Sequence, residues 1–193
     1  MIADVINGYN MVGANYYYID GLQSKRLITK FLDTDDWKEW AKIYDAKDSI
    51  RFSDQFGQEK REMKAKMWVR HQLTRYVDQT YGMQWIINKD TGEKIGQCGL
   101  LLQDINGKIE LEVGYSIFKD YWGQGYAKEG ARLFVDFGFK SLRVSSLISL
   151  IDPKNYPSQR VAERIGMTRG AFRKWKGVDY YVYRITREDW EKA

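Results

Sequence analysis

The chain has 193 residues, which is long enough for one domain with a substantial buried core. Apolar residues make up 44% of it and charged residues 30%, a balance typical of a globular protein rather than a disordered or membrane-spanning one. Lysine and arginine total 31 against 26 acidic residues, so the net charge of +5 would attract an anionic cofactor or partner. The basic residues form no dense tract with interleaved aromatics, so direct binding of nucleic acid is not expected.

The cysteine and histidine content restricts the chemistry further. Cys98 is the only cysteine and His71 the only histidine, which excludes an intrachain disulfide. The same count excludes the Cys/His cluster of a zinc site, so no metal is expected. His71 lies in a charged stretch without a nucleophile signature, so we do not expect a serine or cysteine triad.

The N-terminal region carries no recognisable targeting signal. It lacks the cationic start and apolar core of a signal peptide, and no apolar run is long enough to span a membrane, which favours a cytoplasmic protein. Residues 1–21 form an extension whose role the sequence leaves open. The stretch Tyr16-Tyr17-Tyr18 would suit an added strand, a lid or a dimer contact, so a homodimer stays among the expected assemblies.

Residues 1–193 are predicted to form a single domain, because no repeat and no Pro/Ser-rich linker divides the chain. A short strand is predicted at residues 26–29. The polar residues 33–36 supply capping groups for a helix that begins at Trp37. A second helix, rich in charges of both signs, is predicted over residues 58–78.

The hydrophobic period then changes from 3.6 to 2, which is typical of strands. This alternation predicts successive antiparallel strands at residues 84–88, 94–102 and 108–118. Asp90-Thr91-Gly92 and Asn106-Gly107 are the turns between them, and the second dipeptide provides the positive φ angles of a tight hairpin. Alternation along the third strand places Glu110 and Glu112 on the same face.

The second half of the chain predicts a crossover. A glycine-rich turn at residues 122–127 leads into a helix with apolar residues spaced to pack on a sheet, and residues 144–151 follow as a buried strand. A strand, helix and strand in this order form a right-handed parallel crossover, so the sheet should be mixed and mostly antiparallel, in an α/β (α+β) fold. A short helix from Pro157 to Gly166 and two closing strands, at residues 169–175 and 180–186, complete the prediction.

The segment Gly123-Gln124-Gly125-Tyr126-Ala127 is a candidate phosphate site. Small residues between a strand and a helix let backbone N–H groups approach an anion at the positive end of the helix. The segment is neither a Walker loop nor a dinucleotide fingerprint, since Lys128 occupies the third glycine position of the latter. The alternative interpretation is a tight turn that merely begins a helix.

The surrounding residues carry a family resemblance. The segment LEVGYSIFKDYWGQGYAKEG, residues 111–130, resembles the central acetyl-CoA-binding motif of the GNAT superfamily, and most closely the branch of ribosomal-protein N-terminal (alanine/serine) acetyltransferases. Asn155-Tyr156-Pro157-Ser158, leading to Ile165-Gly166-Met167, is similar to a second motif of that branch. The resemblance covers residues 22–190. Trp122 and Lys128 depart from residues common in the superfamily or the branch.

The resemblance implies a GNAT-like mixed sheet flanked by helices and acetyl-CoA as the acyl donor. It also implies that the third strand splays at a bulge, for which Gly114 is a plausible place, so that nearby backbone N–H groups are free for the pantetheine arm and the carbonyl oxygen. The cofactor-binding residues that follow from it are Tyr115, Ser116, Ile117, Phe118, Trp122, Gly123, Gln124, Gly125, Tyr126, Ala127, Lys128, Asn155 and Ser158.

Attack of an amine on a thioester needs a base, an oxyanion donor and a group that assists the leaving thiolate. Glu112 resembles the strand glutamate that several family members use as a base, acting here through water. Glu110 is the reserve candidate. The alternative is that both are solvent-facing carboxylates that balance nearby lysines.

The short helix offers the remaining catalytic candidates. By resemblance Ser158 hydrogen-bonds the leaving thiolate and Asn155 holds the pantetheine amide, while helix capping is the other interpretation of Asn155. Arg160 and Arg164 either approach the nucleotide phosphates or are solvated.

The expected function is therefore N-acetyl transfer from acetyl-CoA to a primary amine. The branch resemblance favours a protein N-terminal amine, such as that of a ribosomal protein. A small amine, an aminoglycoside or a polyamine, is the enzymatic alternative. A non-catalytic acyl-CoA-binding regulatory module is the alternative outside catalysis.

Overall fold

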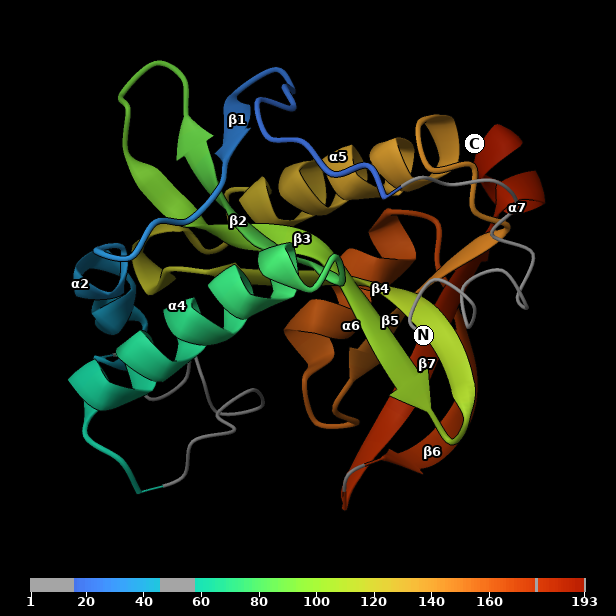
Figure 1. Cartoon of the computed structure of the whole chain (residues 1–193). Coiled ribbons are helices and arrows are strands. Elements are labelled where there is room, and N and C mark those ends of the chain that lie inside the picture. Colours follow the sequence, from blue (N-terminus) through green and yellow to red (C-terminus); the bar gives the residue numbers. More distant parts are fainter. Residues whose placement is uncertain (1–15, 46–57, 176, 193) are drawn as a thin grey trace.

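A seven-stranded sheet forms the centre of the molecule (Figure 1). The computed structural model describes residues 16–45, 58–175 and 177–192. The strands are β1 (Leu27–Lys30), β2 (Tyr81–Asn88), β3 (Lys94–Ile105), β4 (Lys108–Ile117), β5 (Ser146–Ile151), β6 (Thr168–Trp175) and β7 (Val178–Thr186). They lie in the order β1-β2-β3-β4-β5-β7-β6. The β4–β5 pair is parallel and every other pair is antiparallel, which confirms the predicted mixed sheet.

Helices precede, connect and follow the strands. They are α2 (Trp37–Trp40), η1 (Ala41–Tyr44), α4 (Arg61–Val77), η2 (Lys119–Tyr121), α5 (Tyr126–Lys140), α6 (Tyr156–Arg164) and α7 (Arg187–Glu191). Helix α7 was not predicted, although Thr186 and Asp189 form its capping box. None of the helices in the described part of the chain combines the length and the apolar character needed to cross a bilayer.

The acidic run before α2 does not cap that helix in the predicted way. Asp36 is the N-cap residue, but its side chain makes no capping bond to the helix. The Asp36 carboxylate instead accepts a 2.7 Å hydrogen bond from the Asp33 N–H and forms an ion pair with Lys94. The run therefore fixes the loop and connects it to β3.

The helices cover the two faces of the sheet separately (Figure 1). Helix α5 packs on one face, where Ala131 and Phe134 lie in the larger hydrophobic cluster, and α6 joins the same cluster through Ala162. Helices α2 and α4 cover the other face, where Trp40 and Val69 lie in a second cluster. We refer below to the α5 face and the α4 face.

The pairing register assigns the side chains of β4 to these faces. Tyr115 stands opposite Cys98, which lies in the cluster beneath α5. Ser116 stands opposite Gln97, whose side-chain oxygen accepts a 2.8 Å hydrogen bond from Trp68 of α4. Because side chains alternate along a strand, Glu112, Gly114 and Ser116 belong to the α4 face.

Strand β4 separates from β5 after a very short contact. Among the described residues, the parallel pairing of these strands consists of the single pair Glu112↔Ile148. The pairing of β4 with β3 continues without a register shift through Gly114. The predicted bulge at Gly114 is therefore wrong, and the gap arises because β5 diverges from a regular β4.

Within the tyrosine stretch 16–18, Tyr18 is part of the core, and the stretch forms neither an added strand nor a lid. Tyr18 is 9% exposed and packs edge-on against Phe31 and Tyr81. Its hydroxyl donates to the Gly82 carbonyl and accepts a 3.2 Å hydrogen bond from the Leu100 N–H, and these two residues face each other across β2 and β3. Tyr18 thus bridges two central strands.

Replacing Tyr18 with phenylalanine should lower the free energy of unfolding by about 2 kcal/mol, because two buried backbone groups lose their partner. Urea unfolding followed by circular dichroism measures this change. Tyr17→Phe is the matched control, since Tyr17 is 49% exposed, and its unfolding midpoint should match that of the wild type. Equal midpoints for both variants would show that the Tyr18 hydroxyl does not stabilise the sheet.

Candidate active site

A cavity of about 750 Å³ lies beside β4, where that strand leaves β5. On the α5 face its lining includes Tyr126, Ala127 and Lys128 at the start of α5, and further residues of α6. On the α4 face its lining includes Trp40 and Trp68. The cavity therefore passes through the sheet and connects its two faces.

Backbone N–H groups of β4 face this cavity. The Phe118 N–H donates to the Ile95 carbonyl, so it points toward β3. The Val113 carbonyl accepts from Ser149 of β5, and the Ile117 carbonyl accepts from the Trp122 indole at 2.8 Å, so these groups point the other way. Since the N–H and C=O groups of successive residues point to opposite edges of a strand, the N–H groups of Tyr115 and Ile117 point in the same direction as the Val113 carbonyl and face the gap.

The glycine-rich turn has the conformation that an anion site needs. Gly123 and Gly125 have φ of 74° and 83°, in the left-handed region that favours glycine. Gly125 is the N-cap residue of α5, and no side chain caps the helix there. The first N–H groups of α5 are thus available at the positive end of the helix dipole.

Arg26, which was not predicted as a site residue, holds this turn in place. Its guanidinium donates to the Gln124 carbonyl at 3.1 Å and to the Glu129 carboxylate at 2.7 Å, and it lies 4.2 Å from the centre of the Tyr126 ring. Ser24 also donates to Glu129, at 2.7 Å. Ser24 and Arg26 precede β1 and are remote in sequence from α5, so only the folded chain brings these groups together.

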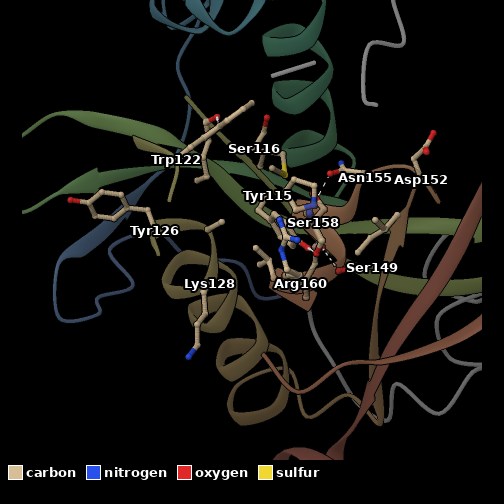
Figure 2. A pocket seen from close by; sticks show the side chains of 18 of the residues that line it. Tyr115, Ser116, Trp122, Tyr126, Lys128, Ser149, Asp152, Asn155, Ser158 and Arg160 are labelled. Atoms are coloured by element: carbon tan, nitrogen blue, oxygen red, sulfur yellow. Dashed lines mark hydrogen bonds between the residues drawn. The ribbon is translucent and has the colours of Figure 1, made fainter. Parts of the chain in front are cut away.

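The charged side chains of the lining are mainly basic. Its cations are Lys128, Lys154, Arg160 and Arg164, and its carboxylates within the described residues are those of Glu112 and Asp152. Figure 2 shows Lys128 pointing away from Ser158, along the outside of α5.

Side chains hold β4 and β5 together where they begin to diverge. One Glu112 oxygen accepts a 3.2 Å hydrogen bond from the Leu150 N–H of β5, and the other accepts a 2.7 Å bond from Gln103. The Ser149 hydroxyl, buried at 2% exposure, donates to the Val113 carbonyl at 2.7 Å. Glu112 thus lies at the apex of the gap, in the cavity lining.

Helix α6 begins at the cavity (Figure 2). The Asn155 side chain accepts a 3.2 Å hydrogen bond from the Ser158 N–H, which confirms the capping role of Asn155. Tyr115 of β4 donates to the Ser158 carbonyl at 2.8 Å, and burial raises the pKa of the Tyr115 hydroxyl well above its ordinary value. Tyr115 is therefore a neutral link that fixes α6 beside β4.

Most of the predicted site residues line the cavity. They are Glu112, Tyr115, Ser116, Ile117, Trp122, Gly123, Gly125, Tyr126, Ala127, Lys128, Asn155 and Ser158. Arg160 and Arg164 line it as well.

Phe118 and Gln124, which the resemblance also implies as cofactor-binding residues, are not part of the cavity lining. Phe118 is 7% exposed and packs against Trp40, with its N–H used by β3. Gln124 donates from its side chain to the Asp120 carbonyl, which shapes the turn from outside.

Glu110, the reserve candidate for the base, lies elsewhere. It lines a separate groove with Arg184, which donates to its carboxylate at 2.7 and 3.0 Å. Burial by itself would raise the pKa of Glu110, but the hydrogen bonds from Arg184 and Lys108 hold that pKa below its ordinary value. Glu110 is therefore a charged partner of Arg184 outside the cavity.

Glu129 anchors Arg26, which holds the glycine-rich turn, so the free energy of unfolding should depend on pH in the range where Glu129 ionises. Burial opposes its ionisation, but hydrogen bonds from Ser24 and Arg26 hold the pKa of Glu129 below its ordinary value. Its contribution should be fully present above the unfolded-state pKa of about 4.3 and lost as the pH falls through the lower folded-state pKa. Glu129→Gln should therefore lower the free energy of unfolding by about 2 kcal/mol at pH 7.

Urea unfolding of wild type and variant at a series of pH values measures this difference, which should shrink below about pH 4. Glu188→Gln is the control, because its ion pair with Lys192 is exposed and should contribute little at any pH. A Glu129→Gln difference that does not change with pH would contradict the prediction.

The geometry agrees with what comparison with known proteins shows. Residues 26–168 match the acetyltransferase (GNAT) domain family. The chain is 45% identical over 98 residues to YkkB of Bacillus subtilis (strain 168), which covers 49% of this chain and 57% of YkkB. It is 30% identical over 112 residues to the N-acetyltransferase p20 of Bacillus licheniformis, which covers 54% of this chain and 62% of p20. The matches reach less than two thirds of the length of these relatives.

Solved structures share the fold. An acetyltransferase from Agrobacterium tumefaciens str. C58 superimposes with a TM-score of 0.72 at 27% identity, covering 89% of this chain and 97% of that one. RimL, described as a ribosomal alpha-N-protein acetyltransferase and solved with coenzyme A, has a TM-score of 0.69 at 17% identity, covering 84% and 95%. The family match extends over most of the chain, and the strand order and the cavity beside β4 are consistent with it. The chain belongs to the GNAT acetyltransferase family.

Proposed function

We propose that this domain transfers the acetyl group of acetyl-CoA to a primary amine. The observation that carries the proposal is the cavity that passes through the sheet between β4 and β5, with a glycine turn at one end and separate walls on the two faces. Donor and acceptor can therefore enter from opposite faces and meet beside β4. Acetyl-CoA supplies an activated thioester, whose carbonyl carbon forms the new C–N bond as the C–S bond breaks.

Residues of the α5 face suit the donor. The N–H groups at the start of α5 and the turn at Gly123 and Gly125 offer a site for the diphosphate, with Arg160 and Lys128 nearby as cations. The N–H groups of Tyr115 and Ile117 face the gap and can bind the amide groups of the pantetheine arm or the acetyl oxygen. Asn155 can bind a pantetheine amide through its side-chain N–H₂ while its oxygen caps α6.

Two side chains are proposed for proton transfer. Glu112 lies on the α4 face, where the acceptor would enter, and can take a proton from the ammonium through a water molecule. Ser158 is half-buried in the lining on the α5 face, and its hydroxyl can stabilise the departing thiolate. The proton lost by the amine and the negative charge on sulfur thus arise on opposite sides of β4.

The acceptor is either a protein N-terminal amine, for instance that of a ribosomal protein, or a small amine. RimL and the family resemblance support the first, since RimL acts on a protein amine by its description. A non-catalytic acyl-CoA-binding module is a different outcome, which would show affinity for the donor without any product.

Binding and turnover test the proposal together. Calorimetry should detect coenzyme A binding at micromolar protein, and thiol release from acetyl-CoA should require an added amine. Ser158→Ala should lower kcat roughly tenfold or more and change the Kd of coenzyme A by less than about threefold, because the hydroxyl acts on the leaving group. Ser141→Ala, at the exposed C-cap of α5, is the matched control with wild-type turnover.

Binding without amine-dependent thiol release across peptides and small amines would contradict catalysis and leave the binding module. The absence of any coenzyme A binding would contradict the proposal as a whole. Full turnover by Ser158→Ala would remove that residue from the mechanism.

The Glu112→Gln variant tests whether Glu112 acts as a base or only holds β4 and β5 together. A base is needed most at acidic pH, where the acceptor amine is protonated, so the ratio of wild-type to variant kcat/KM should be larger near pH 6.5 than near pH 9 and reach roughly a hundredfold. Glu110→Gln is the control on the same strand, outside the cavity. An unchanged pH profile with a raised Kd for acetyl-CoA would assign Glu112 to the β4–β5 contact alone.

A further inference from the structure

We infer that the acceptor is a primary amine carried on a single apolar or aromatic group, with no other positive charge. Its binding site is the wall formed by Trp40, Ile43, Tyr44 and Trp68 on the α4 face, called here the aromatic wall. The inference rests on the proposed function, because it names the substrate of the same cavity.

The position of the aromatic wall makes it the acceptor side. The start of α5 and α6, with their N–H groups and cations, occupies the opposite face and suits the nucleotide. The aromatic wall shares its face of the sheet with Glu112 and Ser116, which project from β4 beside the gap. A molecule packed on this wall therefore reaches the gap from the side away from the donor.

The wall is a preformed apolar surface whose accessible part is formed by Tyr44 and Trp68, because Trp40 and Ile43 are only 3% and 1% exposed. The Trp40 and Trp68 rings are stacked, with centroids 5.8 Å apart and an interplanar angle of 20°. Behind them, Trp85 lies edge-on to Trp40 at 5.7 Å. Gln97, itself fully buried, accepts the 2.8 Å hydrogen bond from the Trp68 indole and fixes its orientation. A rigid aromatic surface binds a flat or bulky apolar group at a low cost in conformational entropy.

The acceptor face offers few carboxylates to a polycation. Within the described lining, the carboxylates are those of Glu112 and Asp152, the aromatic wall carries no charge, and the basic residues Lys128, Arg160 and Arg164 belong to α5 and α6 on the donor face. An aminoglycoside or polyamine needs several carboxylates to offset desolvation of its ammonium groups. A single amine needs one, and Glu112 provides it.

Burial of the amine against this wall also favours the reaction. Desolvation lowers the pKa of an ammonium group, so an acceptor held on an apolar surface loses its proton more readily. The neutral amine is the species that attacks the thioester. The same surface thus selects the acceptor and raises the fraction of the reactive form.

A panel of amines tests the inference through both binding and turnover. Calorimetry with the protein–coenzyme A complex and thiol release with acetyl-CoA would each use 2-phenylethylamine, phenylalaninamide, spermidine and kanamycin. We expect 2-phenylethylamine and phenylalaninamide to bind at least tenfold more tightly than the polycations, and to have at least tenfold higher kcat/KM, a ratio corresponding to burial of one aromatic ring at roughly 1.5 kcal/mol or more. A preference for 2-phenylethylamine would indicate a small amine as the acceptor, and a preference for phenylalaninamide would indicate a peptide N-terminus.

Variants on α4 locate the site. Trp68→Ala should raise the KM for 2-phenylethylamine roughly tenfold or more, with kcat reduced less and the Kd of coenzyme A unchanged. Trp68→Phe should retain most of the affinity, which separates the apolar surface from the hydrogen bond to Gln97. Met67→Ala is the matched control, since Met67 is the exposed neighbour of Trp68 on the same helix and lies outside the lining.

The outcomes separate the inference from the function on which it rests. Tighter binding or faster acetylation of spermidine or kanamycin would overturn the inference and leave the acetyltransferase function intact. If no amine is acetylated, the function fails, while the calorimetric order of the four amines still decides the inference. An unchanged KM in a folded Trp68→Ala protein would also overturn it, and its melting temperature shows whether the protein is folded.

Discussion

The separation of β4 from β5 is the constraint on which the candidate site depends. A continuous sheet would leave no passage between its faces, and it would use the N–H groups of Tyr115 and Ile117 for strand pairing. The structure confines the pairing to Glu112↔Ile148 and reinforces it with side chains of Glu112 and Ser149. The fold thus opens one edge inside the sheet while β4 stays straight against β3.

Local chemistry made much of the fold predictable. Asn106-Gly107 indicates a tight hairpin because few other residues tolerate positive φ, and these two have φ of 54° and 83°. The order of strand, glycine turn, helix and strand predicts a parallel crossover, and β4, α5 and β5 form it. The family resemblance then identified the glycine-rich turn as the cofactor site. Without it, the turn could equally have been a tight turn that merely begins a helix.

Features that depend on contacts between distant segments could not be predicted. Arg26 is one charged residue near a short strand, and its role depends on Glu129 and the turn, which lie about a hundred residues further along the chain. Phe118 lies next to true lining residues, but its side chain belongs to the cluster beneath α4. The helices that carry the aromatic wall were predicted, but the wall was not, because a helical period does not say which face of a sheet a helix covers.

Two backbone carbonyl groups on the open edge of β4 are occupied by side chains, and this affects how readily the edge can pair with another chain. Ser149 occupies the Val113 carbonyl, and the Trp122 indole occupies the Ile117 carbonyl. An exposed strand edge is a template for pairing with another chain, and pairing needs free acceptors as well as free donors. These two side chains therefore make the interior edge a poorer template for intermolecular strand addition.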